Sequence, residues 1–221
     1  MGFGLRAVND NSYVQIDSDS PRLCLLGKGT YGASSYTATV TFPVSIKTQE
    51  PPMVFIRPAT ANSNEPYRTM ILTGSAGNWT GFQISASNLN YRPAGDWFVA
   101  AFASRGDATF GMRLFGPDGS LAYDTGAYAV LVSTVLSTWT YVGRVQLTIG
   151  AYYKWVCGRA LAAGEYFMIN VFSLGIQDNN SGSTCAVSMD YTNNQTCMWA
   201  NGFTAWVDQG HRPVLFAKLV V

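Results

Sequence analysis

Residues 110–125 of this chain read FGMRLFGPDGSLAYDT, and this stretch has the features of a β-hairpin. Its centre, Gly116-Pro117-Asp118-Gly119, places proline where its fixed φ suits a type I turn and glycine where a positive φ is needed. Because apolar residues flank this turn on both sides, the stretch predicts two antiparallel strands joined tightly.

The same pattern occurs near the start of the chain, where residues 3–18 read FGLRAVNDNSYVQIDS. Phe, Gly, Arg and Asp are identical at four of the sixteen aligned positions, and the offset is 107 residues at both ends (110 − 3 and 124 − 17). We interpret the two stretches as copies of one unit, with chance similarity between two hairpins as the alternative. The repeated Arg and Asp can pair across each hairpin if the strand register brings them opposite one another.

These two windows, residues 2–18 and 109–126, resemble small tail-tip and tail-fibre structural proteins of tailed bacteriophages. The features that carry the resemblance are the Gly-Phe-Gly-Leu-Arg opening, the Gly-Pro-Asp-Gly-Ser turn and the following Leu-Ala-Tyr-Asp-Thr-Gly stretch. The first copy departs from the pattern at its turn, where Asn-Asp-Asn-Ser replaces Gly-Pro-Asp-Gly. The resemblance implies a structural, host-facing β protein and assigns no catalytic residues.

Strand signals recur along the chain at short intervals, separated by Gly, Asn and Pro. The predicted strands lie at residues 36–46, 53–56, 82–87, 97–103, 140–149, 165–174, 185–191, 202–207 and 214–221. They predict an all-β fold of two tandem β-sandwich-like domains, residues 1–105 with the first copy of the repeat and residues 106–221 with the second. One larger β-sandwich with an internal pseudo-repeat is the alternative.

The composition indicates a protein that shares surface with partners. Charged residues make up 12% of the 221 residues, about half the usual share, and the formal net charge is +1. So few charges predict a homo-oligomer or a bound component, although a surface rich in Ser, Thr and Asn can also supply polarity. The apolar chain end, residues 214–221, is the predicted edge strand in such a contact. The scattered basic residues predict no nucleic-acid partner, and no apolar run reaches the ~18 residues of a membrane span.

Catalytic signals are sparse, and we interpret the chain as not an enzyme. The one histidine, His211, lies in a turn sequence without a Gly-x-Ser-x-Gly elbow, so no serine triad is predicted. Cys24, Cys157, Cys185 and Cys197 lack Cys-x-x-Cys spacing and are expected to be free thiols, with no metal and no cofactor. A pair of carboxylates brought together in space, as in glycoside hydrolases, is left open.

Aromatic side chains beside amides are the remaining candidate contacts with a ligand or partner. Asn78-Trp79 and Asn90-Tyr91 combine a ring with an amide group, the pairing that sugars need for stacking and hydrogen bonding. Trp97 and Trp155 lie in apolar strands and are predicted to be buried. Core packing is the alternative for Trp79 and Tyr91 as well.

Together these features predict a non-enzymatic structural component of a phage tail tip or tail fibre, with other virion tail proteins as partners. The sequence has no signal peptide, so we expect assembly in the host cytoplasm and localisation in the virion, without membrane insertion. Recognition of a host-cell receptor or glycan is part of this expectation. A lectin-like carbohydrate-binding module is the first alternative, and a polysaccharide hydrolase is the second.

Overall fold

The computed structural model of the chain describes residues 6–8, 10, 14–17, 22–106, 109–116, 119, 121–147, 150–172, 176–178, 181–183, 185–201 and 212–219. Strands dominate these segments, and the helical elements among them are two 3-10 turns, η1 (Thr60–Asn62) and η2 (Asn170–Phe172). The prediction of an all-β, sandwich-like fold is confirmed.

One layer of the sandwich is a seven-stranded antiparallel sheet. Its strand β4 (Thr37–Ile46) shows how the sequence forms it: Ala38, Val40 and Phe42 are buried, whereas the threonines between them face solvent. The spatial order of the strands is β12 (Thr140–Leu147), β13 (Gly150–Cys157), β18 (Gln195–Ala200), β17 (Cys185–Asp190), β6 (Tyr67–Ser75), β7 (Asn78–Ala86) and β4.

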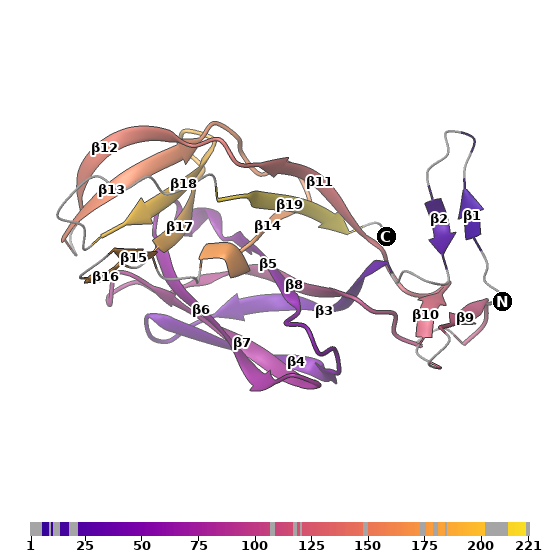
Figure 1. Cartoon of the computed structure of the whole chain (residues 1–221). Coiled ribbons are helices and arrows are strands. Elements are labelled where there is room, and N and C mark those ends of the chain that lie inside the picture. The colour runs from indigo at the N-terminus through magenta and orange to yellow at the C-terminus, as the bar shows by residue number, and fades with distance from the viewer. Residues whose placement is uncertain are drawn as a thin grey trace.

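The other layer is a six-stranded antiparallel sheet, and Figure 1 shows the two layers with two small hairpins at one end, near the N-terminus. Its spatial order is β11 (Val130–Leu136), β19 (Val214–Leu219), β14 (Glu165–Met168), β5 (Met53–Pro58), β8 (Ala94–Phe102) and β3 (Leu23–Gly32). A further short hairpin joins β15 (Ile176–Asp178) to β16 (Ser181–Ser183).

The main core lies between the two layers and is rich in aromatic rings. Trp97 of β8 packs edge-on against Phe82 of β7, with ring centroids 5.5 Å apart, and lies 5.8 Å from Phe42 of β4. Trp97 and Trp155 are both buried, as the sequence predicts. Apolar burial of this kind, at ~25 cal/mol per Å², is the main source of stability holding the layers together.

The predicted division into domains 1–105 and 106–221 does not hold for the sandwich. Phe167 of β14 pairs with Ile56 of β5, and Val187 of β17 pairs with Tyr67 of β6. Each sheet therefore contains strands from both halves of the chain, and both halves contribute to the main core. The observed architecture is the alternative, one larger β-sandwich.

The six-stranded sheet also buries its outer face. Phe55 and Phe98 stack there with ring centroids 4.6 Å apart, and Tyr166 packs edge-on against Phe98. At one end the two edges of this sheet meet, because Cys24, in β3, pairs with Ala129, next to β11. The sheet therefore curls around a second, smaller core.

The C-terminal strand occupies a different position from the predicted one. β19 pairs with β11 on one side and with β14 on the other, so it lies inside the sheet. The exposed edge on this side is β11. β19 is thus covered on both sides by strands of the same chain, which removes the liability of an open edge there.

Candidate assembly surface

The two copies of the sequence repeat form two hairpins with the same register. The N-terminal hairpin pairs β1 (Arg6–Val8) with β2 (Val14–Asp17), and the second hairpin pairs β9 (Arg113–Phe115) with β10 (Leu121–Asp124). Each has one irregularity, which leaves Gln15 unmatched in the first and Ala122 unmatched in the second, again 107 residues apart (122 − 15). The predicted hairpins are confirmed, and β2 and β10 lie near each other at the same end of the sandwich (Figure 1).

The repeated arginine and aspartate are partners across the second hairpin. Arg113 Nε donates to Asp124 Oδ2 at 2.8 Å, and a second guanidinium nitrogen donates to the Gly106 carbonyl at 2.9 Å. The other Asp124 oxygen accepts the Gly126 amide at 2.7 Å. Asp124 is fully buried, so these bonds replace the water that its charge would lose. In the first copy the backbone places Arg6 opposite Asp17 in the same way.

The repeated glycine and hydroxyl residue also have a structural role. The Met112 amide donates to Thr125 Oγ1 at 3.2 Å, and the Thr125 amide donates back to the Met112 carbonyl at 3.1 Å. Gly111 has a φ of +135°, and a Cβ on it would lie 1.8 Å from Thr125 Oγ1. Only glycine fits this position without a shift of the threonine.

The second hairpin is anchored to the sandwich through its unmatched residue. Ala122 is buried, and its carbonyl accepts a bond from Ser104 Oγ at 3.2 Å. Arg105, which follows Ser104 in the chain, donates to the Leu26 carbonyl of β3 at 2.6 Å. These contacts hold the hairpin beside β3 and the end of β8.

Large apolar side chains remain in solvent around this hairpin. Phe110 is 90% exposed and Phe115 is 59% exposed. We call the group the hairpin-end patch, and it consists of the exposed side chains of Phe102, Phe110, Met112, Phe115 and Tyr128. Isolated exposed apolar residues are ordinary, and five large ones within one 27-residue stretch (102 to 128) make this end of the molecule the candidate interaction site.

A pocket of about 330 Å³ lies between the second hairpin and the sandwich. Leu121 of β10 forms one wall, and Leu26, Val44 and Ile46 form others. Lys47, Thr48 and Arg105 add polar groups at the same pocket. Its mainly apolar lining suits an apolar side chain or ligand with a polar or anionic end.

Asn78 and Trp79 bond to two residues that line this pocket, Lys47 and Thr48. Trp79 is half-buried, and its indole Nε1 donates to the Thr48 carbonyl at 2.9 Å. Asn78 is exposed, and its Oδ1 accepts Lys47 Nζ at 2.8 Å. These residues therefore hold the 47–48 segment that lines the pocket, and the Trp79 ring packs on the main core.

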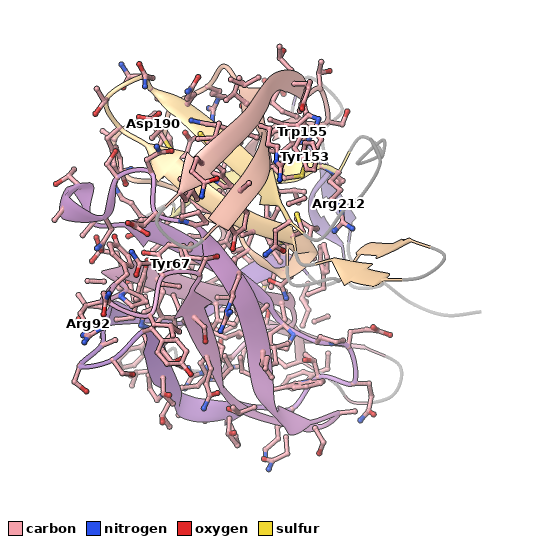
Figure 2. The ribbon with its side chains drawn as sticks, turned by 90° about the vertical axis from the view of Figure 1, so that its left-hand side faces the viewer. Tyr67, Arg92, Tyr153, Trp155, Asp190 and Arg212 are labelled. Atoms are coloured by element: carbon pink, nitrogen blue, oxygen red, sulfur yellow. The ribbon has the colours of Figure 1, made fainter. Side chains whose placement is uncertain are left out.

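Asn90 and Tyr91 lie at the opposite end. They follow the far end of β7, whose nine residues span ~30 Å, so the structure does not bring them together with Trp79. Tyr91 packs against the main core, and burial raises its pKa. Tyr67 of β6, labelled in Figure 2, is buried in the same core, and its hydroxyl is 3.3 Å from that of Tyr31. Tyr91 is a packing residue, whereas the Asn90 side chain is exposed.

The sequence does not single out the aromatic row that the structure forms on β12 and β13. Tyr141 packs against Trp155 and Tyr153, with ring centroids 5.3 and 6.4 Å apart. Figure 2 shows Tyr153 and Trp155 near one another on the ribbon. Tyr141 is exposed, and so is Arg144 on the same strand. Only the pairing of β12 with β13 reveals this row, although the spacing of Tyr153 and Trp155 places both on one face of a strand.

The buried carboxylates of the described residues are each held by a cation. Asp124 pairs with Arg113, Glu165 with Arg159 at 2.9 Å, and Asp190 with Lys154 at 3.8 Å. Burial alone would raise the pKa of Asp190, but hydrogen bonds from Asn193 and Gln195 and the charge of Lys154 lower it. These groups are structural anions.

Within the described side chains, no cluster of three or more His, Cys, Asp or Glu could hold a metal ion. His211 lies outside the described residues. All four cysteines are buried and free. Cys185 lies opposite Ala200 and Cys197 opposite Ser188, so the β17–β18 register keeps those two thiols three residues apart.

The hairpin end therefore combines exposed apolar side chains with a partly apolar pocket, and it can bury a partner's apolar groups. The helical elements of the described segments are single turns, too short to cross a membrane. No family model, curated protein or solved structure matches the chain.

Proposed function

We propose that this protein is a non-enzymatic structural component of a phage tail tip or tail fibre, which assembles through its hairpin end with other virion tail proteins. The observation that carries the proposal is the hairpin-end patch, with Phe110 and Phe115 largely in solvent. Apolar residues of this size are worth ~1.5–3 kcal/mol each when a partner buries them. The two sequence windows that resemble tail proteins are the two hairpins that lie at this end.

The arrangement of these hairpins supports a role in contacting a partner rather than in stabilising the fold of this chain. Each hairpin is a separate two-stranded sheet at one end of the sandwich. The described strands of the two layers pair with one another and not with the strands of the hairpins. The ion pair and the turn contacts of the second hairpin fix its shape, while its large apolar side chains face outwards. A rigid element that presents apolar anchors is the usual form of a protein interface.

Mass spectrometry of gradient-purified phage particles tests the virion assignment. We expect the chain to copurify with intact particles in a fixed ratio to known tail proteins. The double variant Phe110→Ser with Phe115→Ser should fold normally and be depleted from particles, because it removes apolar anchors without touching the core. Leu89→Ser, at an apolar residue outside the patch that is about as exposed as Phe115, is the control and should be incorporated normally. Absence of the chain from particles contradicts the proposal.

A lectin-like binding module is the second candidate, and the row of Tyr141, Tyr153 and Trp155 is the observation that favours it. The exposed Tyr141 ring, with Arg144 on the same strand, suits stacking against a sugar and hydrogen bonding to its hydroxyls. A glycan-array screen with the wild-type chain and Tyr141→Ala tests this function. Binding that Tyr141→Ala abolishes and Leu89→Ser preserves supports it, and no binding by the wild type contradicts it.

A further inference from the structure

Strand β11 is the exposed edge of the six-stranded sheet and carries no charged residue. Its sequence is Val-Leu-Val-Ser-Thr-Val-Leu, from Val130 to Leu136. Its inner side pairs with β19. On the outer side, the pairing among the described residues lies just before the strand, where Ala129 pairs with Cys24 and the Tyr128 carbonyl accepts the Leu25 amide at 2.9 Å. Natural proteins usually protect such an edge with charges or proline, and β11 has neither.

Three apolar side chains of this edge are largely in solvent. Leu131 is 54% exposed, Val132 is 38% exposed and Val135 is 55% exposed. An edge strand with unpaired backbone groups and exposed β-branched residues is a template for pairing with another strand.

A bulge in β11 decides which side chains share a face. Leu131 and Leu136 lie opposite Lys218 and Val214 of β19, so both lie on the side of the main core. Val132 and Val135 lie opposite Ala217 and Leu215, so both lie on the other side. In a regular strand, residues an odd number of positions apart lie on opposite faces, as Val132 and Val135 would, and so would Leu131 and Leu136. The extra residue, Ser133, brings the two members of each pair to the same face.

The sequence of the edge reads the same in both directions once Ser and Thr are taken as equivalent. Leu131-Val132-Ser133-Thr134-Val135-Leu136 is a palindrome centred between Ser133 and Thr134. In an antiparallel pair of two such strands, Leu131 lies opposite Leu136 of the partner subunit, and Val132 opposite Val135 of the partner subunit. Because the bulge puts each of these pairs on one face, like side chains meet across the pair.

We propose that β11 pairs antiparallel with β11 of a second copy of this chain, about a two-fold axis between Ser133 and Thr134. A two-fold contact requires a surface that is complementary to itself, which a palindromic strand with matching faces supplies. The Ser133 hydroxyl donates to Glu165, so the bulge that sets the faces is held from inside the sheet. The two six-stranded sheets then join into one continuous sheet. The residues of this contact, 131–136, are not among those of the hairpin-end patch, and the inference does not rest on the virion proposal.

Cysteine crosslinking tests both the contact and its register. Facing Cα atoms in an antiparallel pair are about 4.5–5.5 Å apart, within the range of a disulfide. A mixture of tagged Val132→Cys and untagged Val135→Cys chains should therefore form a covalent dimer of one chain of each kind on mild oxidation. Either variant alone should crosslink poorly, because identical residues lie about 10 Å apart along the strands.

Sedimentation velocity over a series of concentrations provides the second measurement. The wild type should show a reversible dimer, and Val135→Lys should shift the equilibrium to monomer by at least tenfold, because it places a charge at the centre of the contact. Val142→Lys, on the edge strand β12 and equally exposed, is the matched control and should dimerise like the wild type. Near-ultraviolet circular dichroism confirms that both variants are folded.

A wild type that stays monomeric at every concentration overturns the proposal. So does equal crosslinking of Val132→Cys with itself and with Val135→Cys, because that result requires a different register. If Val135→Lys were unfolded, the cysteine pair, which adds no charge, would still decide between the outcomes.

Discussion

Arg113 and Asp124 face each other across the second hairpin at 2.8 Å, and Arg6 and Asp17 are opposite one another in the same register of the N-terminal hairpin. The pair links two residues that the sequence repeats, and it explains why they recur together. A buried aspartate needs a cation or several donors, and Arg113 supplies the charge from the neighbouring strand. The repeated sequence motif thus corresponds to one hairpin register that occurs twice in the chain.

Replacement of Arg113 by alanine should loosen this hairpin without unfolding the sandwich. The change leaves Asp124 buried without its cation, a cost of about 1–3 kcal/mol. Because the second hairpin lies at one end of the fold, we expect faster hydrogen exchange at residues 113–124 and unchanged exchange in β5 and β8. Arg92→Ala, at an exposed arginine that bonds to the Leu89 and Tyr91 carbonyls, is the control. Equal protection of the hairpin in both variants contradicts the role of the ion pair.

Gly111→Ala should destabilise the second hairpin for two separable reasons. The φ of +135° disfavours any Cβ, and the new methyl collides with Thr125 Oγ1. Gly119→Ala is the matched comparison, because Gly119 has a φ of +79° and open space where its Cβ would lie. We expect Gly119→Ala to cost ~1 kcal/mol in local stability and Gly111→Ala more, measured by hydrogen exchange of the hairpin. The added substitution Thr125→Ala should recover part of the difference, and no recovery would mean that the collision is unimportant.

Local features of this fold are predictable from sequence, whereas the pairing between distant strands is not. The second hairpin follows from its Pro-Gly turn, and β4 follows from its alternation of threonine with apolar residues, both of which are local. The two-domain prediction fails because Ile56 pairs with Phe167, 111 residues away (167 − 56). Nothing in either segment specifies that partner.

The candidate contacts show the same limit. Trp79 and Tyr91 stand among polar residues in the sequence, yet both rings pack against the main core. Conversely, Tyr141 lies in an ordinary strand pattern and is exposed because β12 is an edge strand. Exposure depends on position in the sheet, and that position is set by non-local pairing. The repeat was visible in the sequence, but the exposed Phe102 and Tyr128 beside the second hairpin required the structure.

The curled outer core predicts a large effect at Phe55. This ring is fully buried and stacks on Phe98 at 4.6 Å, outside the main core between the layers. Phe55→Ala should lower the free energy of unfolding by about 3–5 kcal/mol, through lost burial and the cavity left behind. Phe102→Ala is the control, since that ring is exposed, and it should change stability by less than about 0.5 kcal/mol. Similar urea midpoints for the two variants would show that the outer face of this sheet is not a core.

The ionised Glu165 carboxylate should make the free energy of unfolding of this protein fall at acid pH. Burial alone would raise its pKa, but hydrogen bonds from Arg159, Ser133 and the Ala162 amide lower the pKa to about 2, from an ordinary value of 4.5. The unfolded chain therefore takes up this proton at a higher pH than the folded one. The carboxylate contributes its full stabilisation above pH 4.5, and the contribution is lost as the pH falls from 4.5 towards 2.

Glu165→Gln tests that contribution. The variant keeps the size of the side chain but leaves Arg159 without its anion, and we expect a loss of about 3 kcal/mol near neutral pH. The difference in unfolding free energy between wild type and variant should shrink as the pH falls below 4.5, because only the wild type loses the charged pair. Glu50→Gln, at an exposed carboxylate, should keep the slope of the wild type. Urea titrations at a series of pH values measure all three proteins, and a wild-type advantage that stays constant down to pH 2 would contradict the lowered pKa.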